Sequence, residues 1–288
     1  DLDNLLAQLN DKQRVAVIYD GSLLVIAGAG SGKTRVLTYK IAYLMSQKGV
    51  SPWNIMALTF TNKAAREMKE RIGRLVGSER TVDLKMMGTF HSVFSRILHI
   101  EAEAIGYNSN FTIYDQTDAR SLIKSIIKEM QLDDKTYKPA AVADRISMAK
   151  NNLLLPTQYA TSSWAADDAQ HKRPMVSHIY NRYAERCRQA NAMDFDDLLV
   201  QTYVLLKEHE GIRYKYNTRY KYIFVDEYQD TNVAQREILK LLYVPEENTI
   251  CAVGDDAQSI YSFRGATIDN ILNFKEDFKN ALVFLDIN

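Results

Sequence analysis

The sequence predicts an α/β fold in which a parallel sheet is covered by helices on both faces. Short apolar runs with the length of strands recur along the chain, and most of them lead into glycine or acidic residues. Stretches with apolar residues at helical spacing alternate with these runs. Such alternation is typical of strands joined by crossover helices, which form parallel sheets. A third observation is a long middle stretch without runs of this kind, which predicts a mostly helical insertion.

Five apolar runs carry the strand prediction. The first, at residues 23–27, ends at a glycine-rich segment and is typical of a strand buried on both faces. Apolar residues then recur at helical spacing from Val36 to Leu44, and a second helical stretch spans about 62–75. The other strand candidates are 55–60, 222–225, 249–253 and 283–285.

The stretch from about residue 105 to 190 is the predicted helical insertion, since apolar residues between Leu122 and Met130 recur at helical spacing. From residue 120 to 190 there are 12 Lys or Arg against 7 Asp or Glu, an excess of five basic residues. A solvated helical surface explains this excess as well as a nucleic-acid contact does. The predicted organisation is one core formed by 1–104 and 191–288, interrupted by the insertion.

Composition indicates an ordinary globular protein: 288 residues, of which 46% are hydrophobic and 25% charged. The 36 basic and 36 acidic residues cancel, which argues against a polycationic DNA coat but permits a local basic groove. No run approaches the roughly 18 apolar residues of a membrane span, and the start lacks a signal-peptide pattern. Cys187 and Cys251 are expected to be buried, unpaired thiols of a cytoplasmic protein.

The segment Ala27–Thr34, Ala-Gly-Ala-Gly-Ser-Gly-Lys-Thr, closely matches a phosphate-binding P-loop between a strand and a helix. Small residues allow successive N–H groups to curl around a phosphate, and the helix N-terminus favours negative charge there. Lys33 would reach the β/γ oxygens, and the Thr34 hydroxyl would ligate Mg²⁺. A glycine-rich turn followed by a chance Lys-Thr is the weaker interpretation.

The apolar strand at 222–225 supplies the expected partner, because it ends in Asp226 and Glu227. Asp226 would hold Mg²⁺, and Glu227 would orient and deprotonate the attacking water. A surface acidic pair at a strand end is the alternative, and the P-loop makes it the weaker one. A glutamate directly after the metal aspartate favours hydrolysis over transfer to a small molecule.

Further motifs accompany these two segments in the chain. They are Leu9–Ala16, Leu58–Ala65, Gly88–Ser92, Met193–Leu199, Asp226–Thr231, Gly254–Tyr261 and Phe263–Ala266. Together they closely resemble, in order, the Q motif, motifs Ia and Ib, a further signature, and motifs II and III of the UvrD/Rep/PcrA group of superfamily 1 DNA helicases. This resemblance implies a RecA-like core that binds ATP and Mg²⁺.

The resemblance also implies roles around the nucleotide. Gln13 would read the adenine edge, because an amide can both donate and accept, whereas Gln258 would sense the γ-phosphate and Arg264 would contact it or brace motif III. An ordinary loop or capping role stays open for Gln13 and Arg264. The predicted catalytic residues are Lys33, Asp226, Glu227, Gln258 and Arg264. The predicted nucleotide contacts are Gln13, Ala27, Gly28, Ala29, Gly30, Ser31, Gly32, Lys33, Thr34 and Arg35.

Single-stranded DNA is the second ligand that the resemblance implies. Proteins bind single strands by stacking bases on aromatic rings and by hydrogen bonds to the backbone. The implied stacking residues are Phe60, Tyr261 and Phe263, and the implied backbone contacts are Thr61, Asn62 and His91. A core position is the alternative for Phe60. The segments 213–216 and 219–222 also interleave bases with tyrosines, but an ordinary helix leading into a strand is the favoured interpretation.

The family continues past its first motor domain, and this chain stops where the next motif would begin. We therefore expect the second motor domain, 2A/2B, to be absent, together with the arginines that complete the γ-phosphate site. Arginines of that kind are typically worth about 10³–10⁵ in rate, so the isolated chain should be nearly inactive. The intact parent would be a 3′–5′ translocase acting on single-stranded DNA and duplex junctions.

Two other functions remain open for the sequence alone. One is the motor domain of a RecB/AddA-type helicase–nuclease, and the other is an ATP-regulated DNA-binding module without a motor role. A P-loop enzyme for small molecules is the weakest alternative, since motifs Ia, Ib and III would then be unexplained. Repair or replication proteins are conceivable partners, but the sequence specifies none.

Overall fold

The computed structural model describes residues 2–28, 32–255 and 263–285. It divides into two compact units. The core unit comprises Asp1–Val93, Glu210–Thr231 and Leu239–Asn288, and the helical unit comprises Phe94–His209 and Asn232–Ile238. The sequence placed its domain limits instead at 104/105 and 190/191. One reason for the second difference is that helix α12 (Asp197–Glu208) packs on elements of the helical unit.

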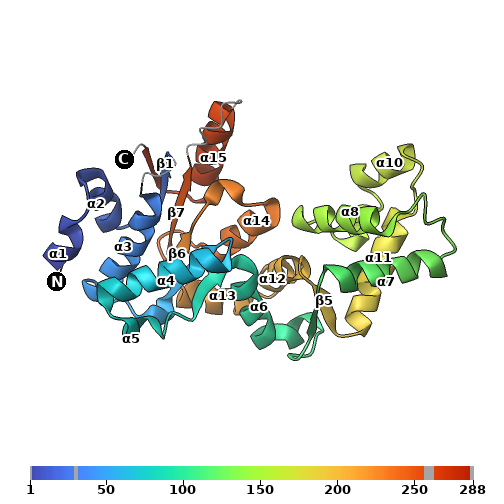
Figure 1. Ribbon diagram of the computed structural model, residues 1–288, viewed down its shortest axis with the longest axis horizontal. Coiled ribbons are helices and arrows are strands. Elements are labelled where there is room, and N and C mark those ends of the chain that lie inside the picture. Colours follow the sequence, from blue (N-terminus) through green and yellow to red (C-terminus); the bar gives the residue numbers. More distant parts are fainter. Residues whose placement is uncertain (1, 29–31, 256–262, 286–288) are drawn as a thin grey trace. The chain divides into compact units, whose positions relative to one another are not determined.

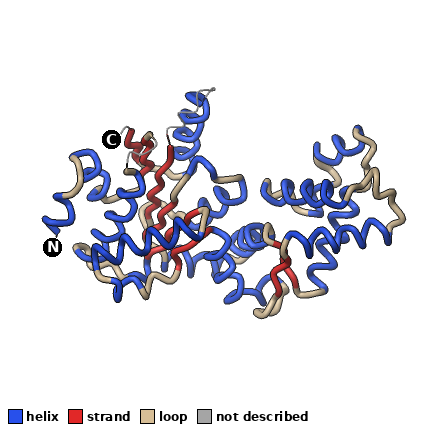
Figure 2. The backbone as a smooth tube through the Cα atoms, in the orientation of Figure 1, coloured by secondary structure: helices blue, strands red, loops and turns tan. Residues whose placement is uncertain are grey.

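The core unit is built on a parallel sheet, as the sequence predicted (Figure 1). Within the described residues this sheet has six strands in the order β3-β2-β6-β7-β1-β8, and every neighbouring pair is parallel. Figure 2 shows these strands gathered in the core unit and a separate short pair in the helical unit. The strands are β1 (Leu23–Ala27), β2 (Ile55–Thr59), β3 (Met86–Thr89), β6 (Tyr222–Val225), β7 (Thr249–Asp255) and β8 (Leu282–Leu285).

The central strands are buried on both faces, which explains why their sequences lack alternation. All five residues of β1 and of β2 are buried. Alternate residues of these strands share one core cluster with helices α2 (Asp11–Ile18), α3 (Lys33–Ser46) and α4 (Asn62–Val76). Members of that cluster include Leu23, Val25, Ala27, Ile55, Ala57, Val36, Leu37, Ile41, Met68 and Ile72.

The remaining elements of the core unit are short or peripheral. The segment that interleaves basic residues with tyrosines forms helix α13, which leads into β6. Tyr216 in this helix and Tyr220 just after it are buried, and their stacked rings have centres 6.2 Å apart. This outcome agrees with the favoured interpretation. The elements are α1 (Leu2–Ala7), α5 (Ser78–Thr81), α13 (Glu210–Arg219), α15 (Phe263–Asp277) and the 3₁₀ helices η1 (Pro52–Asn54) and η3 (Tyr228–Asp230).

The helical unit is mostly helical, but it contains one strand pair that the sequence did not predict. Strands β4 (Thr112–Tyr114) and β5 (Ala192–Asp194) pair in parallel. Its helices are α7 (Gln116–Glu129), α8 (Pro139–Asn151), α9 (Pro156–Tyr159), α10 (Ser163–Gln170), α11 (Val176–Gln189), α12 and the 3₁₀ helix η2 (Ala102–Ile105). Two further helices, α6 (Phe90–Glu101) and α14 (Val233–Leu242), contain residues of both units.

A buried ion cluster lies in the helical unit at the signature Met193–Leu199. The Lys150 ammonium lies 2.6 Å from the Asp194 carboxylate and 2.9 Å from that of Asp197, and the Tyr183 hydroxyl donates to Asp194 at 2.8 Å. Burial by itself would lower the pKa of Lys150, but the two carboxylates hold it well above its usual range. Burial, followed by the adjacent Asp194 charge, raises the pKa of Asp197 to about 6. This signature therefore fixes the junction of α8, β5 and α12.

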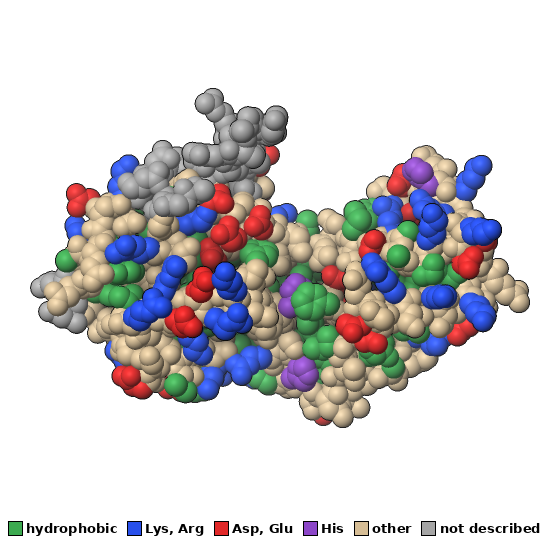
Figure 3. Space-filling view, in the orientation of Figure 1, with side chains coloured by type: hydrophobic (Ala, Val, Ile, Leu, Met, Phe, Trp, Pro, Cys, Tyr) green, Lys and Arg blue, Asp and Glu red, His purple; other side chains and the backbone are tan. Residues whose placement is uncertain are grey.

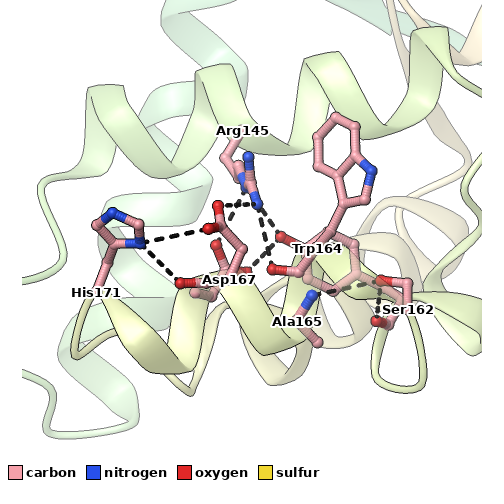
Figure 4. Close-up of polar contacts among 8 residues, drawn as sticks. Arg145, Ser162, Trp164, Ala165, Asp167 and His171 are labelled. Carbon is pink, nitrogen blue, oxygen red and sulfur yellow. Dashed lines mark hydrogen bonds and ion pairs between the residues drawn. The ribbon is translucent and has the colours of Figure 1, made fainter.

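A second polar cluster ties α8 to α9 and α10 (Figure 4). The Arg145 guanidinium lies 4.4 Å from the centre of the Trp164 ring and 3.4 Å from the Asp167 carboxylate. It also donates to the Tyr159 hydroxyl and to Asp168. Because one cation contacts four neighbouring groups, the short helices α9 and α10 are held against α8.

Surface charge and cysteines match the expectations from composition. On the face drawn in Figure 3, Lys and Arg side chains are interspersed with Asp and Glu over each unit. Cys187 and Cys251 are unpaired and buried, and burial raises the pKa of the Cys251 thiol to about 11. Among the described residues, no helix combines the length and the apolar character needed to cross a bilayer.

Candidate nucleotide site

The parallel sheet brings the predicted P-loop lysine and the acidic strand to the same edge. The register places Ala27, the last residue of β1, beside Asp255, the last residue of β7. Lys33 at the start of α3 forms an ion pair with the Asp255 carboxylate, and its Nζ lies 4.0 Å from Glu227 Oε1. The Lys33 side chain is only 11% exposed. An ammonium group therefore lies among carboxylates that come from two neighbouring strands.

The N-cap of helix α3 is a glycine, and the backbone conformation at this position favours glycine. Gly32, its N-cap, has a φ of +78°, a left-handed conformation that L side chains rarely adopt. A Cβ atom at this position would also lie 2.9 Å from Gln13 Nε2. The exposed N–H groups of the first helical turn at Lys33 and Thr34 favour an anion at this end.

Gln13 is placed by a capping box on α2. Its Oε1 accepts a hydrogen bond from the Asn10 backbone N–H at 3.1 Å, and the Asn10 side chain accepts one from the Gln13 N–H at 2.8 Å. Gln13 thus has the capping role that the sequence left open, while its Nε2 lies against Gly32. Gln13 therefore helps to cap the start of α2 and holds its amide against Gly32.

A hollow of about 780 Å³ lies beside the start of α3. Four of its lining residues are basic, namely Lys33, Arg35, Arg71 and Arg74. Arg35 is held by a bond of 2.9 Å from its Nη2 to the carbonyl of Gln8. Arg71 and Arg74 of α4 were not singled out from the sequence, although their spacing of three residues places both on one helix face. The volume and the positive lining suit a nucleotide with its phosphates.

Asp226 and Glu227 follow β6 in unusual environments. Asp226 is 5% exposed, and burial, followed by the neighbouring Glu227 charge, raises its pKa to about 6. Its Oδ1 accepts a bond of 2.8 Å from the Glu227 N–H. Glu227 has a φ of +50°, in the left-handed region that costs a non-glycine residue energy. Strained backbone of this kind is concentrated at functional sites.

Comparison with known proteins decides the family. Residues 9–279 match the family model described as the UvrD/REP helicase N-terminal domain. The chain belongs to this family. It is 45% identical over its whole length to a Staphylococcus aureus protein named ATP-dependent DNA helicase PcrA, and 46% identical over 98% of its length to the Bacillus subtilis protein of that name. It spans 38% and 37% of those relatives, less than two fifths of their length.

Four of the predicted DNA-contact residues, Phe60, Thr61, Asn62 and His91, follow two neighbouring strands. The register pairs Thr59 with Thr89, so Phe60 and His91 both lie near one end of the β2–β3 pair. Phe60 is half-buried, with its ring centre 5.2 Å from that of Phe90. The position of Phe60 is therefore partly core and partly surface, between the two alternatives that the sequence left.

The adjacent polar residues have mixed surroundings. Thr61 caps α4 by accepting from the Ala64 N–H at 3.0 Å, and Asn62, the first residue of α4, is exposed. Burial lowers the pKa of His91 to about 4, so the ring is neutral at pH 7 and can form hydrogen bonds without carrying charge.

Some predicted site residues cannot be placed. Ala29, Gly30, Ser31, Gln258 and Tyr261 lie outside the described residues. Phe263 and Arg264 begin α15, but their side chains are not described.

Lys40 is a residue of this UvrD/REP domain that the sequence did not single out. It is 5% exposed, and its Nζ donates to the carbonyls of Ala16, Val17 and Tyr19 at 3.0, 3.2 and 2.7 Å. These carbonyls end α2, which carries Gln13, so the lysine joins α2 to the P-loop helix. Burial lowers the pKa of Lys40.

We expect Lys40→Met to destabilise the core unit by roughly 1–3 kcal/mol, since buried carbonyls lose their donor. Chemical denaturation measures this loss. Lys48→Met, at an exposed lysine just after α3, is the matched control and should change stability by less than about 0.5 kcal/mol. Equal effects of the two substitutions would contradict the assigned role.

Proposed function

We propose that this chain is the ATP-binding part of an ATP-dependent DNA helicase, whose hydrolysis of ATP is stimulated by single-stranded DNA. The observation that carries the proposal is the meeting of Lys33, Asp226, Glu227 and Asp255 at the carboxyl edge of one parallel sheet. Ligands of open parallel sheets bind at this edge. The relatives' name, ATP-dependent DNA helicase, supports the same function.

The residues present fit a magnesium nucleotide. Asp226 and Thr34 offer the hard oxygen donors that Mg²⁺ prefers. A buried carboxylate with a pKa of about 6 lacks enough compensating positive charge, so a cation there would be stabilising. Asp226 and Thr34 would hold the Mg²⁺, which would supply positive charge to neutralise the phosphates.

The protein groups have separate tasks in the proposed reaction. The first turn of α3 and the Lys33 ammonium bind the phosphates. Glu227 orients a water molecule toward the γ-phosphate and accepts its proton. Arg35, Arg71 and Arg74 bind the rest of the nucleotide in the 780 Å³ hollow. Gln13, whose amide lies against Gly32, reads the adenine edge. We assign Gln258 and Arg264 to the γ-phosphate on the strength of the family resemblance.

For DNA, we propose that Phe60, Tyr261 and Phe263 stack on bases, while Thr61, Asn62 and His91 contact the backbone. The Phe60 ring is half-buried beside the exposed Thr61 and Asn62, and a partly accessible ring beside polar groups suits single-strand binding. Movement along the strand in the 3′–5′ direction is part of the proposal and rests on the family resemblance. In bacteria such as those of the relatives, such an enzyme would work in the cytoplasm, where the DNA lies.

The deciding experiment measures ATP hydrolysis by the full-length protein that carries this sequence, with and without single-stranded DNA. We expect strong stimulation by DNA, and near-complete loss of turnover in Lys33→Ala because the phosphates lose their charge partner. Lys138→Ala, at an exposed lysine far away in the sequence, is the control for loss of a lysine. Active protein that ignores DNA would refute the helicase assignment and favour a nucleotide-binding module.

A further inference from the structure

The side chain of Gln229 connects the proposed catalytic base to a neighbouring strand. Gln229 lies in η3, two residues after Glu227. Its Nε2 donates to Glu227 Oε2 at 2.6 Å, and its Oε1 accepts from the Asp255 backbone N–H at 3.0 Å. One amide group therefore uses its donor on the carboxylate and its acceptor on the last residue of β7.

The preceding residue of β7 leaves room for this amide. A Cβ atom on Gly254 would lie 2.8 Å from Gln229 Oε1, closer than real Cβ atoms come. The next nearest atoms, the Gln229 backbone N and Ile26 Cδ1, would lie at 3.6 and 3.7 Å, which is ordinary contact. Gly254 has no left-handed φ. The glycine is therefore needed for the Gln229 side chain and not for the backbone.

The Glu227 carboxylate needs such a partner. Its side chain is 34% exposed, and its backbone is already in the left-handed region. A partly exposed carboxylate on a three-bond side chain samples several rotamers unless a neighbour fixes it. General-base catalysis depends on placement, and a displacement of about 1 Å can cost about 10²-fold in rate.

We propose that Gln229 is a positioning residue for ATP hydrolysis, with its amide holding the Glu227 carboxylate at a fixed place relative to the end of β7. The inference rests on the proposed role of Glu227. The strand end to which the amide is bonded begins the motif III segment Gly254–Tyr261, in which Gln258 and Tyr261 follow Asp255 after three and six residues. The amide thus connects the base to the segment that the resemblance assigns to the γ-phosphate and DNA.

Two variants of the full-length protein test the amide from opposite sides. Gln229→Glu keeps an acceptor for the Asp255 N–H but replaces the donor with a charge that repels Glu227. Gly254→Ala alters no polar group and only pushes the amide away. With saturating single-stranded DNA, we expect each to lower kcat by about 10- to 100-fold while KM for ATP changes less than about twofold.

The matched control for the glycine is Gly211→Ala, because an added Cβ there meets nothing within 4 Å. It should leave kcat unchanged. Thermal unfolding of each variant identifies any that fails to fold. If Gln229→Glu does not fold, Gly254→Ala carries the test, because it retains both hydrogen-bonding partners.

A double-substitution cycle separates positioning from a structural role. In the Glu227→Gln background the base is already lost, so adding Gln229→Glu should change the residual rate by less than about twofold. A further loss equal to that in the unsubstituted protein would overturn the inference, as would unchanged kcat in Gln229→Glu. If Glu227→Gln itself retained full turnover, the proposed role of Glu227 would fail first, and that result is visible independently of Gln229.

Discussion

Glu227→Gln is expected to lower the turnover of ATP by about 10²–10⁴-fold, the usual contribution of a positioned general base. The substitution keeps the shape and the left-handed backbone but removes the group that accepts the proton from water. Nucleotide affinity should change little, because Lys33 and the hollow beside α3 are untouched. Steady-state hydrolysis and binding of a fluorescent ATP analogue measure the two quantities on the full-length protein.

The control for this substitution is Glu246→Gln, an exposed glutamate that shares the positive φ of Glu227. It should retain full turnover. Turnover in Glu227→Gln within about threefold of the unsubstituted protein would show that another group accepts the proton, since loss of a base should cost far more.

Lys150→Met is expected to destabilise the protein by roughly 3–5 kcal/mol, the cost of leaving buried charges without their partner. The ammonium is 3% exposed and is the common partner of Asp194 and Asp197. Its removal leaves the two carboxylates beside an apolar side chain, where their negative charges repel each other. Denaturant unfolding followed by circular dichroism measures the change.

Lys138→Met, at the exposed N-cap of the same helix, is the control and should cost less than about 0.5 kcal/mol. Adding Asp194→Asn and Asp197→Asn to Lys150→Met should recover part of the loss, because no buried charge then remains. A loss below about 1 kcal/mol in Lys150→Met would mean that water reaches the cluster and screens the charges.

The sheet was predictable where a strand is an uninterrupted apolar run. Strands β1, β2, β6, β7 and β8 contain such runs, and their predicted limits agree with the structure to within two residues. Strand β3 was missed because Met-Met-Gly-Thr contains a glycine and is only half-buried. Strands β4 and β5 have three residues each, too few for a periodic pattern.

The candidate site was predictable only where its residues lie close together in the sequence. The P-loop and the Asp226–Glu227 pair belong to segments whose chemistry depends on local spacing. Gln229 and Lys40 were not predicted to act as links, because their partners lie 26 and 21–24 residues away and meet them only in the folded chain. Residues of this kind become visible only once strand order and register are known.

The left-handed backbone at Glu227 places the stability of the fold and its proposed catalysis in opposition. Glycine would adopt a φ of +50° without the steric cost that a side chain incurs there. Glycine at this position would therefore relieve the steric cost, and on the proposed role of Glu227 it would also remove the general base. On that role, selection for turnover opposes the replacement. Replacements that accumulate at this residue in a lineage would consequently mark genes that keep the fold after abandoning the motor.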